Sequence, residues 1–135
     1  MRKVMIFGVF DGVHDGHRAL FEQAKKEGDY LVAVVAQDQS AERLKRRLPR
    51  KPLDERIDDL SKEPLVDEVA LGDAEPGAYE IVMKHRPAVI ALGYDQGELK
   101  KDIEENRKRF TWQPKLVVTG PHKPEKYHSS LLVDR

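Results

Sequence analysis

Cysteine is absent from the 135 residues of this chain. Its absence excludes a disulfide framework, a zinc site with thiolate ligands and catalysis by a cysteine nucleophile. An excess of charge of either sign is also missing, because 24 lysine and arginine residues balance 24 aspartate and glutamate residues. A neutral chain gives no general argument for binding nucleic acid or a membrane surface, although local patches remain open to such a role.

Long apolar runs are missing as well. The chain begins MRKVMIFGVF, in which the apolar stretch after the basic residues is too short for a signal peptide. No run reaches the ~20 residues that a transmembrane helix needs. The apolar content and the length suit one globular domain with a real core. We therefore expect a single domain over residues 1–135, in a cytoplasmic protein without nucleic-acid or membrane partners.

Short apolar runs alternate along the chain with segments of helical pattern. The clearest strand is YLVAVVA, residues 30–36, a continuous apolar run of the kind that is buried on both faces of a parallel sheet. The clearest helix covers residues 15–26, with one apolar face and Gly28 as its expected C-cap. Other strands are expected over 3–7, 66–71, 88–92 and 115–119, and other helices over 40–47, 53–61, 76–85, 98–110 and near the C-terminus.

This alternation predicts βαβ units with right-handed crossovers. The expected fold class is α/β, a Rossmann-like, doubly wound sheet of about five parallel strands with flanking helices. Ligands of such sheets bind beyond the carboxyl ends of the strands, where the strand order reverses. Residues 8–17, 37–38 and 93–96 follow the expected first, second and fourth strands, so we expect them at that edge.

The most unusual stretch is GVFDGVHDGH, residues 8–17, in which His14 and His17 stand among three glycines. These histidines could bind a metal ion, pack within the fold or bind phosphate. Zinc needs three or four ligands, and Asp11 or Asp15 would have to complete the site, so no closed ligand set is present. Packing alone fits poorly with two histidines beside glycines at a strand-to-helix turn.

Phosphate binding fits this loop best. A helix N-terminus presents unbonded backbone N–H groups and the positive end of the helix dipole. Glycines let a phosphate approach the backbone closely, and histidines donate N–H groups to phosphate oxygens and stabilise charge in a transition state. The loop matches neither the GxxxxGK[ST] phosphate loop nor the GxGxxG dinucleotide fingerprint. Histidine would therefore take the place that lysine has in a phosphate loop.

The same stretch resembles the G-T-F-D-x-x-H-x-G-H signature of the nucleotidyltransferase superfamily with the cytidylyltransferase-type fold. The resemblance extends along nearly the whole chain, through ALFEQAKKEGDYLVAVVAQD, PLDERIDDL, VDEVALGD, RPAVIALGYDQ and YHSSLLVDR. It implies nucleotidyl transfer, in which an acceptor phosphate attacks the α-phosphorus of a nucleoside triphosphate and pyrophosphate leaves. It also implies a homodimer and a divalent metal ion, expected to be Mg²⁺, that is held largely by the phosphates.

The resemblance assigns roles to individual residues. His14 and His17 would be the catalytic residues, which bind the phosphates and stabilise the transition state. The residues expected to bind the nucleotide or its phosphates are Gly8, Val9, Phe10, Asp11, Asp15, Gly16, Lys45, Arg46, Arg56, Asp95, Lys123, Ser129 and Ser130. Outside the site, His85, His122 and His128 are expected on the surface, and Tyr79 and Trp112 in packing or at an interface.

Some of these residues also have simpler explanations. The run from 43 to 51 holds six basic residues and no acidic one, and such a run is usually a solvated helix face. It follows the second strand, however, and the resemblance places phosphate-binding lysines there, so we expect Lys45 or Arg46 to act. Arg56 could be an ordinary surface arginine, but the resemblance favours a phosphate contact, which suits a planar guanidinium. Asp95 could be a turn residue, and Ser129 and Ser130 could cap the last helix.

Within the superfamily, the chain resembles the archaeal FAD synthases most closely. ALGYDQ matches their LGxDQ pattern, whereas glycerol-3-phosphate cytidylyltransferases read GDDW there and end with RTEGISTT, which is missing here. Some archaeal FAD synthases share a pair of cysteines in the tail, which this chain lacks. The resemblance favours ATP and FMN as substrates and FAD as product. The alternatives are a CTP-dependent cytidylyltransferase for glycerol 3-phosphate or a similar phospho-alcohol, and a non-catalytic nucleotide-binding sensor.

Overall fold

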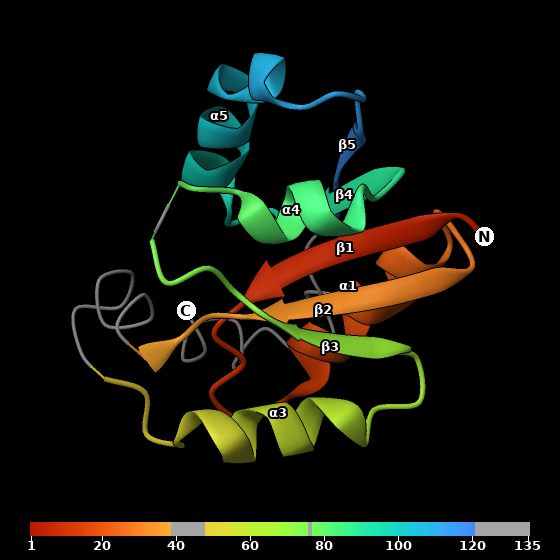
Figure 1. Ribbon diagram of the computed structural model, residues 1–135. Helices are drawn as coiled ribbons and strands as arrows, with labels where there is room; N and C mark the ends of the chain where they lie inside the picture. Colours follow the sequence, from red (N-terminus) through yellow and green to blue (C-terminus); the bar gives the residue numbers. More distant parts are fainter. Residues whose placement is uncertain (39–47, 76, 121–135) are drawn as a thin grey trace.

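The computed structural model describes residues 1–38, 48–75 and 77–120. Its strands form one parallel sheet of five strands in the order β3-β2-β1-β4-β5. They are β1 (Lys3–Gly8), β2 (Tyr30–Val35), β3 (Glu68–Leu71), β4 (Val89–Leu92) and β5 (Lys115–Val118). The order reverses between β1 and β4, which defines a doubly wound sheet (Figure 1). The predicted fold class is confirmed.

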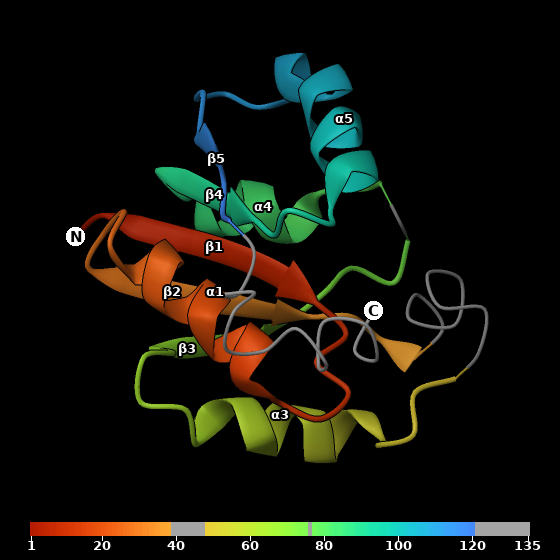
Figure 2. The same ribbon diagram turned by 180° about the vertical axis from the view of Figure 1, so that it is seen from behind.

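Helices cover both faces of this sheet. α1 (Asp15–Lys25) and α3 (Leu53–Ser61) pack on one face, and α4 (Glu80–His85) and α5 (Gly97–Glu105) pack on the other. α4 lies in front of the sheet in Figure 1, and α1 lies in front of it in the opposite view of Figure 2. A 3-10 turn, η1 (Arg107–Arg109), follows α5. Among the described residues, none of the helices has the length and apolarity needed to cross a bilayer.

Alternate residues of the central strand supply the two halves of the core. On β1, Val4 and Ile6 pack with α1 and α3, whereas Met5 packs with α4 and α5. All three side chains are fully buried. Because both faces of β1 are covered, its sequence is a continuous apolar run instead of an alternating one.

Two helices on the second face are shorter than predicted. α4 begins at Glu80, because Gly77 and Tyr79 have φ angles of 82° and 57°, which do not fit a right-handed helix. α5 ends at Glu105, where the side-chain amide of Asn106 donates to a carbonyl of the last turn over 2.7 Å. The predicted helix over 40–47 and the predicted C-terminal helix lie outside the described residues.

The sequence predicted Gly28 as the C-cap of α1, and this prediction is wrong. The cap is Lys26, in right-handed helical conformation. Glycine is needed at position 28 because a Cβ there would lie only 2.4 Å from the carbonyl oxygen of Arg2. The residue therefore allows a close approach between the start of β1 and the turn after α1.

His85 is not a surface residue, which corrects the sequence prediction. Its side chain is only 10% exposed, and Lys3 Nζ lies 3.3 Å from its Nδ1. Trp112 packs as predicted, with its ring stacked on Phe110 and its Nε1–H donated to the Pro87 carbonyl over 2.8 Å. His122 and His128 lie outside the described residues.

Candidate active site

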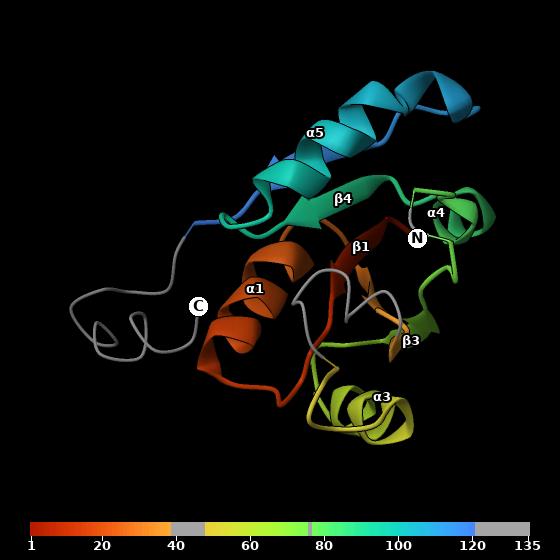
Figure 3. The same cartoon turned by 90° about the vertical axis from the view of Figure 1, so that its left-hand side faces the viewer.

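The loop between β1 and α1 lies at the carboxyl edge of the sheet, beside the point where the strand order reverses (Figure 3). Its backbone turns sharply, with a φ of 53° at Phe10 and 94° at Gly12. The Gly12 N–H donates to the Phe10 carbonyl over 2.9 Å, which closes a three-residue turn centred on Asp11. Glycine adopts a positive φ without strain, but phenylalanine does not. Other contacts must therefore hold this turn.

The side chain of Phe10 provides one such contact. It is only 2% exposed and packs against Phe21 and the edge of the His17 ring, with centroid distances of 6.1 Å and 5.2 Å. Gly8 makes room for it, because a Cβ at that position would lie 2.9 Å from the Phe10 ring. Gly8 and Phe10, both predicted to line the nucleotide site, thus also shape the loop.

The two histidines stack on each other at the start of α1. Their ring centroids are 3.9 Å apart, with an angle of 27° between the planes. The Gly16 N–H donates to His14 Nδ1 over 3.0 Å, and the His14 N–H donates to His17 Nδ1 over 3.2 Å. This reciprocal cap satisfies two N–H groups at the helix start, where the first turn has no intrahelical partners.

The same hydrogen bonds fix the tautomer of both rings. A nitrogen that accepts a hydrogen bond carries no proton, so the proton of each neutral ring is on Nε2. Each ring can therefore offer an Nε2–H to a phosphate oxygen, at the positive end of a helix. Both side chains are half-buried at the edge of the sheet. His14, His17 and Gly16 are thus brought together in a geometry that suits phosphate binding.

Asp11 bonds to the chain that precedes α3. Its two carboxylate oxygens accept the backbone N–H groups of Arg50, over 2.8 Å, and of Lys51, over 2.9 Å. Burial alone would raise the pKa of the Asp11 carboxyl, but these hydrogen bonds and the charges of Arg50 and Arg56 lower it below its ordinary value. An ionised carboxylate accepts hydrogen bonds and cannot donate one to a phosphate. The described geometry therefore gives Asp11 partners other than the phosphate that the resemblance implies.

Arg56 also has a different environment from the one expected. Its side chain has no exposed surface. Nη1 donates to the carbonyls of Val9 and Ala36 over 2.9 Å and 2.8 Å, and Nε donates to the carbonyl of Lys51 over 3.2 Å. Nη2 forms an ion pair of 2.5 Å with Asp38. In this structure Arg56 joins the ends of β1 and β2 to the start of α3 and is not exposed to a phosphate.

The loop after β4 lies on the other side of the point where the strand order reverses. The Gln96 side chain holds it there, because its Oε1 accepts the Gly93 N–H over 2.8 Å and its Nε2 donates to the Phe7 carbonyl over 2.9 Å. Asp95 is exposed at the tip of this loop, at the edge where a nucleotide contact was expected. Sequence reasoning did not assign roles to Gln96 and Asp38, although both lie in the segments that follow β4 and β2.

Asp15, the first residue of α1, has a side chain that is 60% exposed and pairs with Arg18 over 3.3 Å. The other residues that the resemblance assigns to phosphate binding, Lys45, Arg46, Lys123, Ser129 and Ser130, lie outside the described ranges. Within 1–38, 48–75 and 77–120 there is no group of three or more histidines or carboxylates that could hold a metal ion.

Residues 5–135 match the model of the Cytidylyltransferase-like family. The chain belongs to this family. It is 34% identical over 134 residues to the FAD synthase of Thermococcus onnurineus, which covers 98% of this chain and 89% of that protein. It is 41% identical over 136 residues to the FAD synthase of Ferroglobus placidus, covering 100% of this chain and 88% of that protein.

A solved structure supports the same family membership. The lipopolysaccharide core biosynthesis protein of Thermoplasma volcanium is 33% identical and has a TM-score of 0.79, covering 91% of this chain and 99% of that one. A pantoate-beta-alanine ligase from Francisella tularensis shares the fold alone, with 15% identity and a TM-score of 0.63. The resemblance on which the sequence predictions depend is confirmed, and this chain is a cytidylyltransferase-like protein.

Proposed function

We propose that this chain is an FAD synthase, which transfers AMP from ATP to FMN and releases pyrophosphate. The observation that carries the proposal is the stacked pair of histidines at the start of α1. Relatives named FAD synthase, matched over nearly their whole length, support FMN as the acceptor. A phosphate oxygen of FMN would attack the α-phosphorus of ATP. The bond from that phosphorus to the bridging oxygen of the β-phosphate would break, and pyrophosphate would leave with that oxygen.

Transfer of this kind needs positioning and charge stabilisation more than a protein nucleophile. His14 and His17 would donate Nε2–H groups to phosphate oxygens and stabilise the charge of the transition state. The start of α1 would add its dipole, and Asp95 would contact the nucleotide from the loop after β4. Lys45 or Arg46 would hold the pyrophosphate or the acceptor, and Lys123, Ser129 and Ser130 are proposed for the same task.

The divalent ion of the reaction, proposed to be Mg²⁺, would be bound chiefly by the nucleotide. Both oxygens of Asp11 are already engaged by backbone N–H groups, and the described residues offer no ligand cluster. Mg²⁺ keeps several waters and is commonly held by substrate phosphates. When bound, the ion would neutralise charge on the phosphates.

We also propose a homodimer, which the resemblance implies. The two outer strands each expose one apolar residue near the carboxyl end, Leu71 on β3 and Val118 on β5, which are 44% and 48% exposed. Such edges are candidates for contact with a second copy. Analytical ultracentrifugation would measure the mass in solution directly.

The deciding experiment measures pyrophosphate release with Mg²⁺ for ATP or CTP, each combined with FMN, glycerol 3-phosphate or ethanolamine phosphate. We expect release with ATP and FMN, together with FAD identified by chromatography. Release with CTP and a phospho-alcohol would keep the mechanism and replace the substrates. Nucleotide binding without release in any combination would indicate a sensor and contradict the proposal.

A variant pair tests the role of the histidines in the same assay. His17→Ala should lower kcat by about 100-fold to 1,000-fold, the usual loss for one donor to a developing negative charge. Its circular dichroism should match that of the unchanged protein, because the substitution removes one capping hydrogen bond at the start of α1 and leaves the helices and the sheet in place. His85→Asn is the control, since His85 contacts Lys3 at the opposite edge of the sheet, and it should retain activity. Near-normal turnover of His17→Ala would refute the assignment.

A further inference from the structure

We infer that Asp11 is a positioning residue, whose carboxylate fastens the histidine loop to the backbone of Arg50 and Lys51, and that it binds neither metal nor phosphate. Its effect on the reaction rests on the proposed function. Its effect on the loop does not, and can be measured without any substrate.

The loop needs an external support at this residue. Asp11 lies between Phe10 and Gly12, which both have positive φ, and the hydrogen bond between these two neighbours closes a tight turn around it. Phe10 adopts a backbone conformation that side chains with a Cβ disfavour. Such a conformation persists only where surrounding contacts determine it. The loop would therefore relax if its tertiary contacts were lost, and His14 follows three residues later.

The carboxylate of Asp11 supplies such a contact. Each of its oxygens accepts one backbone N–H, from Arg50 and from Lys51, at 2.8 Å and 2.9 Å. These partners lie 39 and 40 residues further along the chain, so the contact joins two segments that are distant in sequence. Hydrogen bonds to an ionised acceptor are about twice as strong as those between neutral groups.

Arg56 holds the same two segments from within the core. It donates to the carbonyl of Lys51 and to the carbonyl of Val9, two residues before Asp11. Lys51 is therefore bound at both ends of its backbone, at its N–H by Asp11 and at its carbonyl by Arg56. A buried cation and a half-buried anion together fix the distance between the histidine loop and the start of α3.

This arrangement argues against a metal ligand at Asp11. Each carboxylate oxygen already accepts one backbone N–H, from Arg50 and from Lys51, and among the described residues Asp11 belongs to no group of three or more histidines or carboxylates that could hold a metal ion. Asn at this position keeps one acceptor oxygen but turns an NH₂ group toward the other N–H donor, so it should lose at least one of the two hydrogen bonds.

The first test is amide hydrogen exchange at Arg50 and Lys51, read by NMR in the unliganded protein. Asp11→Asn and Asp11→Ala should accelerate exchange of both amides by about tenfold or more, as expected when a hydrogen bond to a charged group is lost. Asp58→Asn is the control, because Asp58 pairs with Lys62 on the outer side of α3, and it should leave both amides protected. Unchanged protection in both Asp11 variants would overturn the inference.

The second test is kinetic and uses FAD formation at saturating substrate. Misplacement of a catalytic loop should lower kcat by about 10-fold to 100-fold, while the Mg²⁺ concentration at half-maximal rate stays the same. An increase of that concentration in Asp11→Asn would identify a metal ligand and overturn the inference. Faster exchange with an unchanged kcat would overturn the positioning role. If the unchanged protein makes no FAD, the proposed function fails, and the exchange result still decides whether Asp11 holds the loop.

Discussion

Each histidine of the pair has a structural role at the start of α1, beside the phosphate contact that we propose for it. The backbone N–H groups of Gly16 and His14 occupy the two Nδ1 atoms, so the structural role selects the tautomer that donates from Nε2. The sequence predicted the two residues and their place at a helix start. It could not predict the tautomer, because that depends on the rotamers of both rings.

Arg56 shows how a residue that the sequence singles out can have structural partners that the sequence does not predict. It lies three residues after Leu53 and four before Leu60, on the face of α3 that packs against the sheet. This helical spacing favoured burial over exposure. The resemblance favoured a phosphate contact instead, and the structure shows a guanidinium enclosed by carbonyls and Asp38.

Asp38 is the ionic partner of that buried charge, and its removal should destabilise the fold. Asp38→Ala should lower the free energy of unfolding by about 1–3 kcal/mol, because a buried cation loses its hydrogen-bonded counter-ion. The value is below that of a fully buried pair, since the Asp38 side chain is 49% exposed. Urea unfolding followed by circular dichroism measures it.

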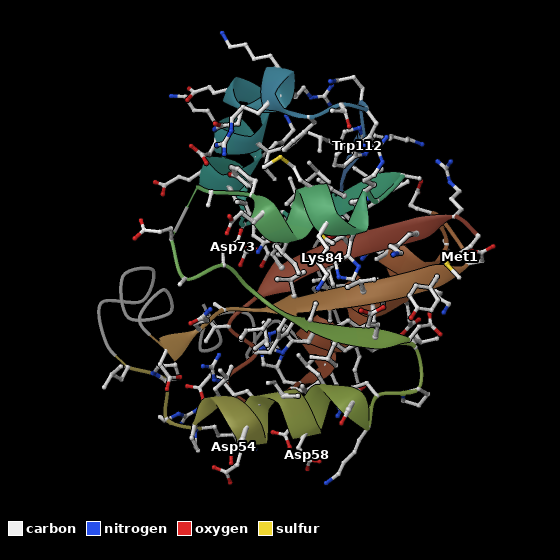
Figure 4. All side chains as sticks on the ribbon, in the orientation of Figure 1. Met1, Asp54, Asp58, Asp73, Lys84 and Trp112 are labelled. Atoms are coloured by element: carbon white, nitrogen blue, oxygen red, sulfur yellow. The ribbon has the colours of Figure 1, made fainter. Side chains whose placement is uncertain are left out.

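Asp58→Ala is the matched control for this measurement. Asp58 lies on α3 and points away from the sheet (Figure 4), where it pairs with Lys62 over 2.9 Å. Exposed pairs of this kind contribute little to stability, so no measurable change is expected. Equal effects of the two substitutions would show that the Arg56 ion pair is not a structural support.

At the scale of elements, a substitution at the start of α1 should affect activity and stability differently. A Cβ at Gly16 would lie 2.9 Å from Cε1 of His14, so Gly16→Ala should displace that ring and its hydrogen bond. We expect kcat to fall about tenfold or more, because the ring that we propose as catalytic is misplaced. Thermal stability should not fall in proportion, since alanine favours a helix over glycine by about 1 kcal/mol.

Gly97→Ala provides the comparison on another helix start. Gly97 is the first residue of α5, and a Cβ there would meet no atom within 4 Å. The substitution should leave kcat unchanged. A parallel loss of activity in both variants would contradict a specific contact between Gly16 and His14.

The order of strands and helices was predictable because each central strand is a continuous apolar run and each long helix has one apolar face. The start of α4 was not predictable in the same way. Tyr79 holds a left-handed conformation there, with its hydroxyl bonded to Asp102 and its ring against Phe110. Burial and the Asp102 carboxylate raise the pKa of Tyr79 well above its ordinary value. These contacts come from α5 and the segment after it, so no local pattern reveals them.

At the scale of the whole molecule, a cluster of polar side chains lies at the amino edge of the sheet, opposite the loop that carries His14 and His17. Lys3 Nζ donates to His85 Nδ1, and Glu68 lies 3.7 Å from His85 Nε2 and accepts from Tyr30. Burial lowers the pKa of His85; Glu68 opposes this, and the charges of Lys3 and Lys84 add to it. The folded protein therefore binds a proton at His85 less readily than the unfolded chain does.

This pKa shift predicts the pH dependence of stability. Below about pH 6.5, the ordinary pKa of histidine, the unfolded chain takes up a proton that the folded protein resists. The free energy of unfolding should thus decrease as the pH falls from 7 to 5 and increase as the pH rises. Urea midpoints across that range measure it, and His85→Asn should flatten the dependence. An equally steep curve in His85→Asn would assign the effect to other groups.

In the stretch GVFDGVHDGH, more residues determine the conformation of the loop than are proposed to take part in the reaction. Gly8 and Gly16 leave space for the rings of Phe10 and His14, and Asp11 secures the turn from outside. A sequence comparison that matches this stretch therefore identifies the loop conformation more directly than it identifies the reaction. Related proteins could therefore act on different acceptor molecules while this stretch stays the same. The residues that select the acceptor would then lie elsewhere in the chain.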